Sequence, residues 1–87
     1  MTPHEKKALA AQVHHLKPVV IVGAKGLTDA VLNEIDAALT THELIKIRLN
    51  GEREDRQEMT NQILAHFDDV TLVKSIGHVI AIYRKNP

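Results

Sequence analysis

The hydrophobic positions at the start of the chain recur at the spacing of a helix. The aliphatic residues that set this spacing are Leu9, Val13 and Leu16. Thr2 is a candidate N-cap, and Glu5, which lies three residues later, completes a capping box. Because the residue before a proline avoids the helical region, we expect this first helix to end at Pro18.

The pattern then changes to a continuous apolar run and back to a helix. Residues 19–22, VVIV, are apolar at every position, which is typical of a strand that is covered on both faces. A second helical stripe follows at intervals of four: Val31, Ile35 and Leu39. Thr28 is the expected N-cap of this helix, and residues 40–43, TTHE, are its expected end.

Apolar and basic residues alternate in the next strand, residues 44–49. We expect the apolar positions to face the core and Lys46 and Arg48 to stand together on the opposite face. A turn at 50–51 leads to a third helix, whose apolar stripe is Met59, Ile63 and Phe67.

Two further strands, 70–74 and 79–84, form a hairpin around residues 75–77. The predicted order is therefore α-β-α-β-α-β-β, an α/β fold in which one mixed four-stranded sheet is packed with three helices. Strands one and two are expected to be parallel, and strands three and four antiparallel.

Composition limits the class of protein. The 87 residues suffice for one domain, residues 1–87, and are too few for two. The run at 19–22 is far shorter than the roughly 20 apolar residues that span a bilayer, and we see no export signal. The absence of cysteine excludes disulfides and cysteine nucleophiles, and it suits a cytoplasmic protein.

Charge is balanced overall but uneven along the chain. Eleven basic and eleven acidic residues give a net charge of zero, which counts against a generally basic nucleic-acid binder. Residues 1–28 nevertheless contain four lysines and one glutamate, whereas 29–45 contain four acidic residues and no basic ones. The protein is therefore expected to have a basic side and an acidic side if the fold brings these segments together.

The turn between the first strand and the second helix has the pattern GxxG, formed by Gly23, Ala24, Lys25 and Gly26. It fails both the dinucleotide fingerprint and the Walker motif. Glycines allow close approach of a ligand, and the amides of Ala24, Lys25 and Gly26 could turn outward beside the free N–H groups that open the next helix. The turn is either a phosphate cradle or a sharp corner with a solvated lysine.

Two long blocks resemble a known family. Residues 16–49, LKPVVIVGAKGLTDAVLNEIDAALTTHELIKIRL, and residues 73–84, VKSIGHVIAIYR, are similar to the CRM domain, the YhbY-type RNA-binding family of bacteria and plant organelles. The resemblance implies a sandwich similar to the C-terminal domain of bacterial translation initiation factor three, with a GxxG loop likened to that of KH domains, which clamps nucleotide backbone. It also implies a stand-alone factor that binds precursors of the large ribosomal subunit.

On this basis we expect an RNA-binding site around the GxxG turn. Its predicted members are Gly23, Ala24, Lys25, Gly26, Thr28, Lys46, Arg48, Lys17, Lys6, Lys7 and Arg84. Lys6, Lys7 and Lys17 flank the loop only if the first helix packs beside it. For each of these cations outside the loop, a merely solvated side chain is the alternative interpretation.

Other chemistry has little support in the sequence. The six histidines lack the spacing of a metal site, and no nucleophile or carboxylate pair indicates catalysis or requires a cofactor. Phe67 and Tyr83 are the two aromatic residues, and both fit a buried role. With so few aromatics, we expect backbone and shape recognition rather than base stacking.

The leading hypothesis is a non-catalytic, monomeric RNA-binding protein of the cytoplasm that engages ribosomal RNA during assembly of the large subunit. The alternative is a protein-interaction module that docks on a ribosomal protein or another assembly factor through its acidic side, residues 29–43. A third hypothesis is a small enzyme that binds phosphoesters; it predicts activity on nucleotides, and we expect none.

Overall fold

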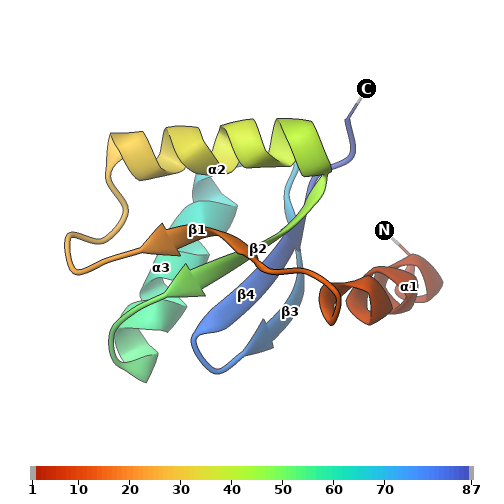
Figure 1. Ribbon diagram of the computed structural model, residues 1–87, viewed down its shortest axis with the longest axis horizontal. Helices are drawn as coiled ribbons and strands as arrows, with labels where there is room; N and C mark the ends of the chain where they lie inside the picture. The colour runs from red at the N-terminus through yellow and green to blue at the C-terminus, as the bar shows by residue number, and fades with distance from the viewer. Residues whose placement is uncertain (1, 87) are drawn as a thin grey trace.

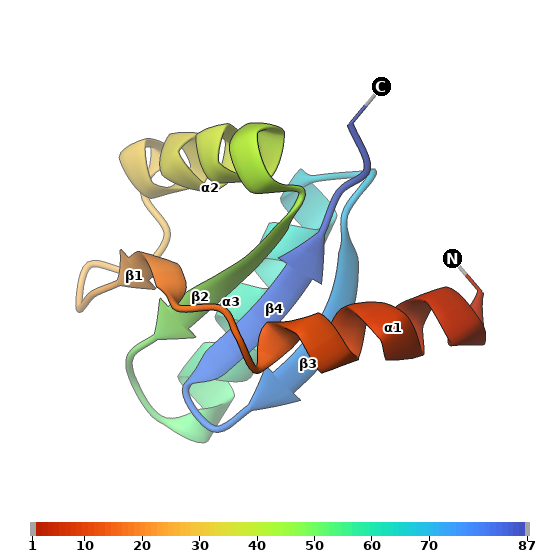
Figure 2. The ribbon, with the colours of Figure 1, turned by 45° about the vertical axis from the view of Figure 1, so that its right-hand side comes forward.

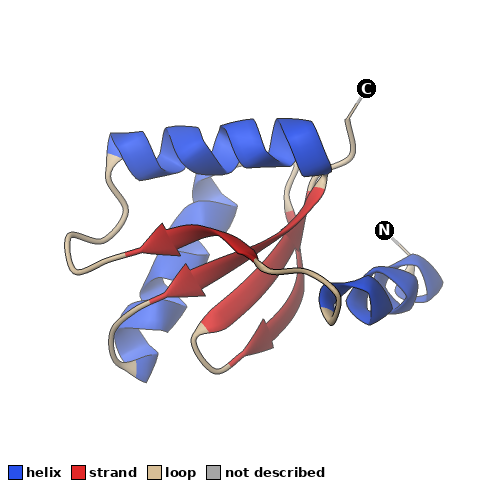
Figure 3. Ribbon diagram, in the orientation of Figure 1, coloured by secondary structure: helices blue, strands red, loops and turns tan. Residues whose placement is uncertain are grey.

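The computed structural model describes residues 2–86 and confirms the predicted order of elements. Within these residues there are three helices and four strands: α1 (Pro3–Val13), β1 (Pro18–Val22), α2 (Asp29–His42), β2 (Leu44–Leu49), α3 (Arg53–His66), β3 (Thr71–Ile76) and β4 (Val79–Tyr83). The helices and strands form one layered α/β unit (Figures 1 and 3).

The four strands form one mixed sheet in the order β1-β2-β4-β3. As predicted, β1 and β2 are parallel, and β3 and β4 are antiparallel; β2 and β4 are also antiparallel neighbours. The hairpin is longer than expected, because β3 continues to Ile76 and the chain turns at Gly77, which has a φ of 54°. Strands β1 and β3 are therefore the two edges of the sheet.

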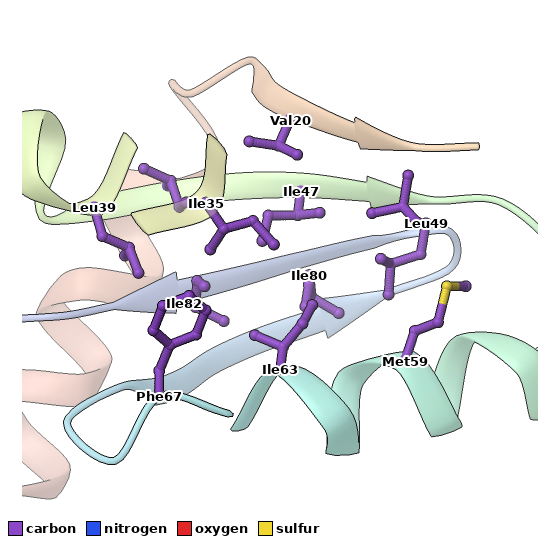
Figure 4. Packing of buried hydrophobic residues seen from close by; sticks show 12 residues of the cluster. Val20, Ile35, Leu39, Ile47, Leu49, Met59, Ile63, Phe67, Ile80 and Ile82 are labelled. Atoms are coloured by element: carbon purple, nitrogen blue, oxygen red, sulfur yellow. The ribbon is translucent and has the colours of Figure 1, made fainter. Parts of the chain in front are cut away.

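Helices α2 and α3 cover one face of the sheet and enclose the main core. Figure 4 shows Ile35 of α2 and Ile63 of α3 pointing toward Ile47 and Ile80 of the two central strands. These four isoleucines are at most 2% exposed. The alternation of β2 thus buries its apolar residues on this face, as the sequence predicted.

Helix α1 packs against the opposite face, where it covers only part of the sheet (Figure 2). Val13 lies in a second, smaller core cluster with Leu44, Val73 and Ala81 of the sheet. The hydroxyl of Thr2 accepts a hydrogen bond from the Glu5 N–H at 3.2 Å, so Thr2 caps α1 as predicted.

The predicted end of α1 is wrong. The helix stops at Val13, and residues 14–17 form a turn and an irregular segment before Pro18. Leu16 still packs on the second cluster, although it is no longer helical. Its carbonyl accepts a hydrogen bond from the Lys46 ammonium at 3.0 Å. This bond from a β2 side chain replaces the backbone N–H that would bind the carbonyl in a continuing helix.

The expectation that residues 19–22 are covered on both faces is also wrong. Val20 and Val22 are buried in the main core, but Val19 is 48% and Ile21 is 61% exposed. The reason is the position of β1 at the sheet edge, beyond the strands that α1 contacts. A continuous apolar run therefore leaves aliphatic side chains at the surface.

Candidate nucleic-acid interface

The GxxG turn projects from the end of β1 and leads into α2 (Figure 1). Its last amide is already used, because the Gly26 N–H donates to the Gly23 carbonyl at 3.0 Å. The expectation that the Gly26 amide turns outward is therefore wrong. The amides of Ala24 and Lys25 lie between the two ends of this closed turn, and Lys25 is exposed.

The two glycines of the turn differ in what requires them. Gly26 has a φ of 71°, the left-handed region that favours glycine. At Gly23 the backbone lies outside that region, and an added Cβ would meet nothing within 4 Å. The folded protein therefore needs a glycine at position 26, whereas at position 23 the space in front of the backbone is open to a ligand.

Helix α2 begins immediately after the turn, with Thr28 as its N-cap. The Thr28 hydroxyl accepts the Val31 N–H at 3.2 Å, which confirms the predicted cap. The N–H groups of Asp29 and Ala30 precede the first intrahelical hydrogen bond and add partial positive charge beside the turn. Asp29 offsets part of that charge with its own carboxylate.

The cavity between the turn and α3 is poorly suited to phosphate. Lys25 lines it, but so do the carboxylates of Asp55 and Glu58. Two acidic side chains oppose an anion that enters from this side. The acidic residues of this cavity therefore disfavour binding of an anion on the α3 side of the turn.

Facing away from α2 and α3, the sheet carries an uncovered surface that we call the open face. It comprises Ile21, Lys46, Arg48, Lys74, Ile76 and Val79. Strand pairing fixes one row across all four strands: Ile21, Arg48, Val79 and Ile76. The next row places Lys46 and Lys74 on either side of Ala81. Residues opposite one another in a sheet point to the same side, so these cations lie together.

The charges are segregated in space as the sequence suggested. The α1 side consists of α1, the connection to β1 and the open face, and its charged residues are Lys6, Lys7, Lys17, Lys46, Arg48, Lys74 and Glu5. This side therefore has a surplus of five positive charges. The other ten acidic residues lie with five basic ones on α2, α3 and the loops, so the net charge of zero arises from two opposed sides.

Lys74 is a member of this surface that the sequence analysis missed. It points to the open face because a bulge between Leu72 and Lys74 shifts the register of β3. Its ammonium lies 3.4 Å from Nε2 of His14 at the end of α1. A bulge interrupts the two-residue period, so simple alternation along β3 could not have identified this side chain.

The condition set for Lys6, Lys7 and Lys17 is not met, because α1 does not pack beside the GxxG turn. Its first turn lies at the end of the molecule opposite to the turn (Figures 1 and 2). Lys6 and Lys7 are exposed there and extend the basic side without flanking the loop. Lys17 is exposed and directly precedes β1, so it lies nearer in the sequence to the open face than Lys6 and Lys7 do.

Arg84 has a structural role that the sequence did not indicate. Its guanidinium donates to the Asp36 carboxylate at 2.7 Å and to the Thr40 hydroxyl at 3.0 Å. The side chain is only 13% exposed and lies 5.9 Å from the centroid of the Phe67 ring. Arg84 therefore joins the end of β4 to α2 and lies apart from the other predicted site cations.

Phe67 is buried in the main core, and Tyr83 packs on the second cluster. Among residues 2–86 no group of three or more His, Asp or Glu side chains is arranged to hold a metal ion. None of the helices described here has the length and apolar character needed to span a membrane.

Comparison with known proteins places this geometry in context. Residues 1–84 match the model of the CRS1 / YhbY (CRM) domain. The chain is 46% identical over its full length to a Pseudomonas aeruginosa protein named "Probable RNA-binding protein PA4753", of which it covers 84%. It is 41% identical over 97% of its length to a Haemophilus influenzae protein named "RNA-binding protein", of which it covers 85%.

A solved structure has the same fold. The solution structure of the Staphylococcus aureus protein SAV1595 superposes with a TM-score of 0.82 at 28% sequence identity. The match covers 100% of this chain and 91% of that one. The overall fold is thus shared with a protein that differs at most sequence positions.

Proposed function

Because the chain belongs to the CRS1 / YhbY (CRM) domain family, we propose that it is an RNA-binding protein whose RNA lies on the GxxG turn and the α1 side. The names of the Pseudomonas and Haemophilus relatives support RNA as the partner. The observation that carries the proposal is the segregation of charge, which gives a neutral protein one side with a surplus of five positive charges.

The proposed contacts divide into two groups. Gly23, Ala24 and Lys25 hold backbone phosphate at the turn, where the open space in front of Gly23 admits a close approach. Lys46, Arg48 and Lys74 hold phosphates on the open face, and Lys17, Lys6 and Lys7 extend the footprint along the α1 side. Gly26 and Thr28 shape the turn and cap α2, and Arg84 is left out because its guanidinium binds Asp36.

The finer proposal is that the RNA is ribosomal RNA in a precursor of the large subunit. On this view the protein is a non-catalytic assembly factor of the cytoplasm. The support is the resemblance of the sequence to stand-alone bacterial members of the family. Recognition by backbone contact suits a structured RNA, because phosphate positions report its shape.

A second candidate function is docking on a ribosomal protein through the acidic side. Asp29 and Glu34 are exposed on α2 and could pair with a basic partner. Asp36, by contrast, is occupied by Arg84 at 2.7 Å. The acidic side would then position the protein on a particle whose RNA is bound by the opposite side.

The direct test is the affinity of purified protein for large-subunit precursor RNA across a salt series. Replacement of Lys25 by Ala is expected to weaken binding and to lower the slope of log affinity against log salt by about one unit, because one phosphate contact is lost. Lys85→Ala serves as the control, since Lys85 is exposed at the end of β4 and away from the turn. A parental slope for Lys25→Ala would remove Lys25 from the site.

Sedimentation of cell extract separates the two candidate functions. The RNA proposal expects the protein to co-migrate with large-subunit precursors and to be released by complete ribonuclease digestion. Persistent co-migration after digestion would favour docking on a protein. A Glu34→Lys variant that loses co-migration, while it keeps its affinity for naked RNA, would identify the acidic side as the docking surface.

A further inference from the structure

The exposed large hydrophobic residues of this protein are gathered on its basic side. Among the described residues they are Val19, Ile21 and Ile76, with exposed fractions of 48%, 61% and 56%. Ile21 and Ile76 belong to the open face, where the row across the sheet places Arg48 between Ile21 and Val79. Val19, at the bulge of β1, lines a neighbouring cavity together with Lys17 and Lys46. Chance exposure would scatter such residues over the surface, so their coincidence with the cations calls for an apolar and anionic occupant.

The open face is also hollowed beside α1. A cavity of about 200 Å³ has Lys46 and Lys74 at its sides and Ile76, Val79 and Ala81 among its apolar lining residues. It is smaller than the roughly 300–1,000 Å³ of typical small-molecule sites, so it fits part of a larger ligand. The Lys46 ammonium donates one hydrogen bond to the Leu16 carbonyl and retains two further N–H donors.

We propose that the open face binds an unpaired segment of the RNA, with bases against its aliphatic side chains and phosphates on Lys46, Arg48 and Lys74. This inference rests on the proposed function and names the form of RNA that the site takes. Each nucleotide combines one anionic phosphate with one apolar base face. That combination matches cations and aliphatic side chains that alternate across strands about 4.8 Å apart.

An RNA duplex does not complement this surface equally well. Its phosphates face outward, but its base faces are stacked inside the helix, where Ile21 and Ile76 cannot contact them. An acidic peptide would match the charge, yet the lysines and arginine lie on two strands, β2 and β3, on either side of β4 and among the aliphatic residues, rather than along one edge. A single RNA strand laid across the sheet uses both components of the surface.

The chemistry of the face also sets how selective it is. Four-stranded RNA-binding sheets that stack two or three bases do so with aromatic side chains. Here the corresponding surface is aliphatic, so bases gain burial of apolar area without the geometry of ring stacking. Because aliphatic side chains form no hydrogen bonds with base edges, this segment should be bound with little preference for sequence.

The test uses the full chain and two labelled RNAs, a single strand and the same strand in a duplex, titrated across a salt series. The variant Ile21→Thr/Ile76→Thr removes the apolar groups but keeps β-branched residues in both strands. We expect single-strand affinity to fall about tenfold, as for the loss of roughly 50–60 Å² of buried apolar contact, with an unchanged salt slope. Duplex affinity should stay within about twofold, since phosphate contacts dominate it.

Arg48→Gln gives the contrasting behaviour, because it should lower the salt slope for both RNAs. Ala65→Ser, at an exposed position of α3, should leave every value at the parental level. Both isoleucines are exposed, so the double variant should fold, which its urea unfolding curve would verify.

Each outcome decides between the readings. Equal loss of single-strand and duplex affinity, or no loss of either, would overturn the inference while the proposed function stands. A parent protein that binds neither RNA would overturn both. The double variant could also keep its single-strand affinity but lose an association with ribosomal particles that survives ribonuclease. That result would overturn the inference and show that the open face binds a protein.

Discussion

The two faces of the sheet are built from the same strands and have opposite properties. On the side of α2 and α3, Ile45, Ile47 and Leu49 of β2 are at most 1% exposed in a closed core. On the other side, Lys46 is half-buried and Arg48 is exposed. One six-residue strand thus contributes to stability with one set of alternate residues and to the candidate interface with the other.

The two helical coverings explain this difference. Helices α2 and α3 together span the sheet, whereas α1 contacts mainly β2 and β3 and leaves the open face beside it. The larger core can then fix the strands without help from the open face. The side chains of the open face lie outside this larger core.

The largest expected effect tests the comparison between the two faces. Ile47→Ala, in the closed core, should lower the free energy of unfolding by about 2–5 kcal/mol through lost transfer energy and a residual cavity. Ile21→Ala, on the open face, should lower it by about 0.5 kcal/mol or less. Urea unfolding of both variants measures the difference, and similar losses would show that the open face is part of the stabilising core.

The next effect concerns two cations near the C-terminus. Arg84→Gln breaks the contacts with Asp36 and Thr40 and should destabilise the fold by about 1–3 kcal/mol. Its RNA salt slope should remain parental. Lys85→Gln, at the exposed neighbouring position, should change neither stability nor slope. A reduced slope for Arg84→Gln at intact folding would return Arg84 to the RNA site.

A smaller effect distinguishes the two glycines of the turn. Gly26→Ala forces an L-residue into a φ of 71° and should cost about 1–2 kcal/mol of stability. Gly23→Ala should leave stability within about 0.5 kcal/mol, because its new methyl group meets nothing within 4 Å. We expect Gly23→Ala to weaken RNA binding nonetheless, since the methyl group occupies the path of a phosphate. If Gly23→Ala leaves the RNA affinity unchanged, the turn does not bind phosphate at this position and serves only to connect β1 to α2.

The smallest effect on folding accompanies a clear effect on binding. Arg48→Gln and Arg53→Gln remove one exposed arginine from the open face and from the start of α3, respectively, and each should alter stability by less than about 0.5 kcal/mol. Arg48→Gln should lower the RNA salt slope by about one unit, and Arg53→Gln should not. Equal slopes for the two variants would mean that the segregation of charge does not direct RNA to the α1 side.

Much of the fold could be predicted from local patterns. Helical spacing predicted all three helices, and the alternation of residues 44–49 predicted which side of β2 is buried. These features succeed because side-chain period and capping are properties of neighbouring residues. The errors fell where distant contacts decide: α1 ends at Val13, and β1 is covered on one face only.

The candidate site divides in the same way. The GxxG turn and the pair Lys46 and Arg48 could be predicted, since each lies within one short segment. Lys74 could not, because its side depends on a bulge in the pairing of β3 with β4. The engagement of Arg84 was equally hidden, because Asp36 lies 48 positions away in the chain.

The sequence by itself therefore determined the elements, their order, the family and the unequal distribution of charge along the chain. The tertiary structure alone decided which strands lie at the edges and which cations share a face with the exposed aliphatic residues. The physical reason is that periodicity shows only which residues of a helix or strand share a face. Which side is closed, and by what, depends on where α1 packs and on the order β1-β2-β4-β3.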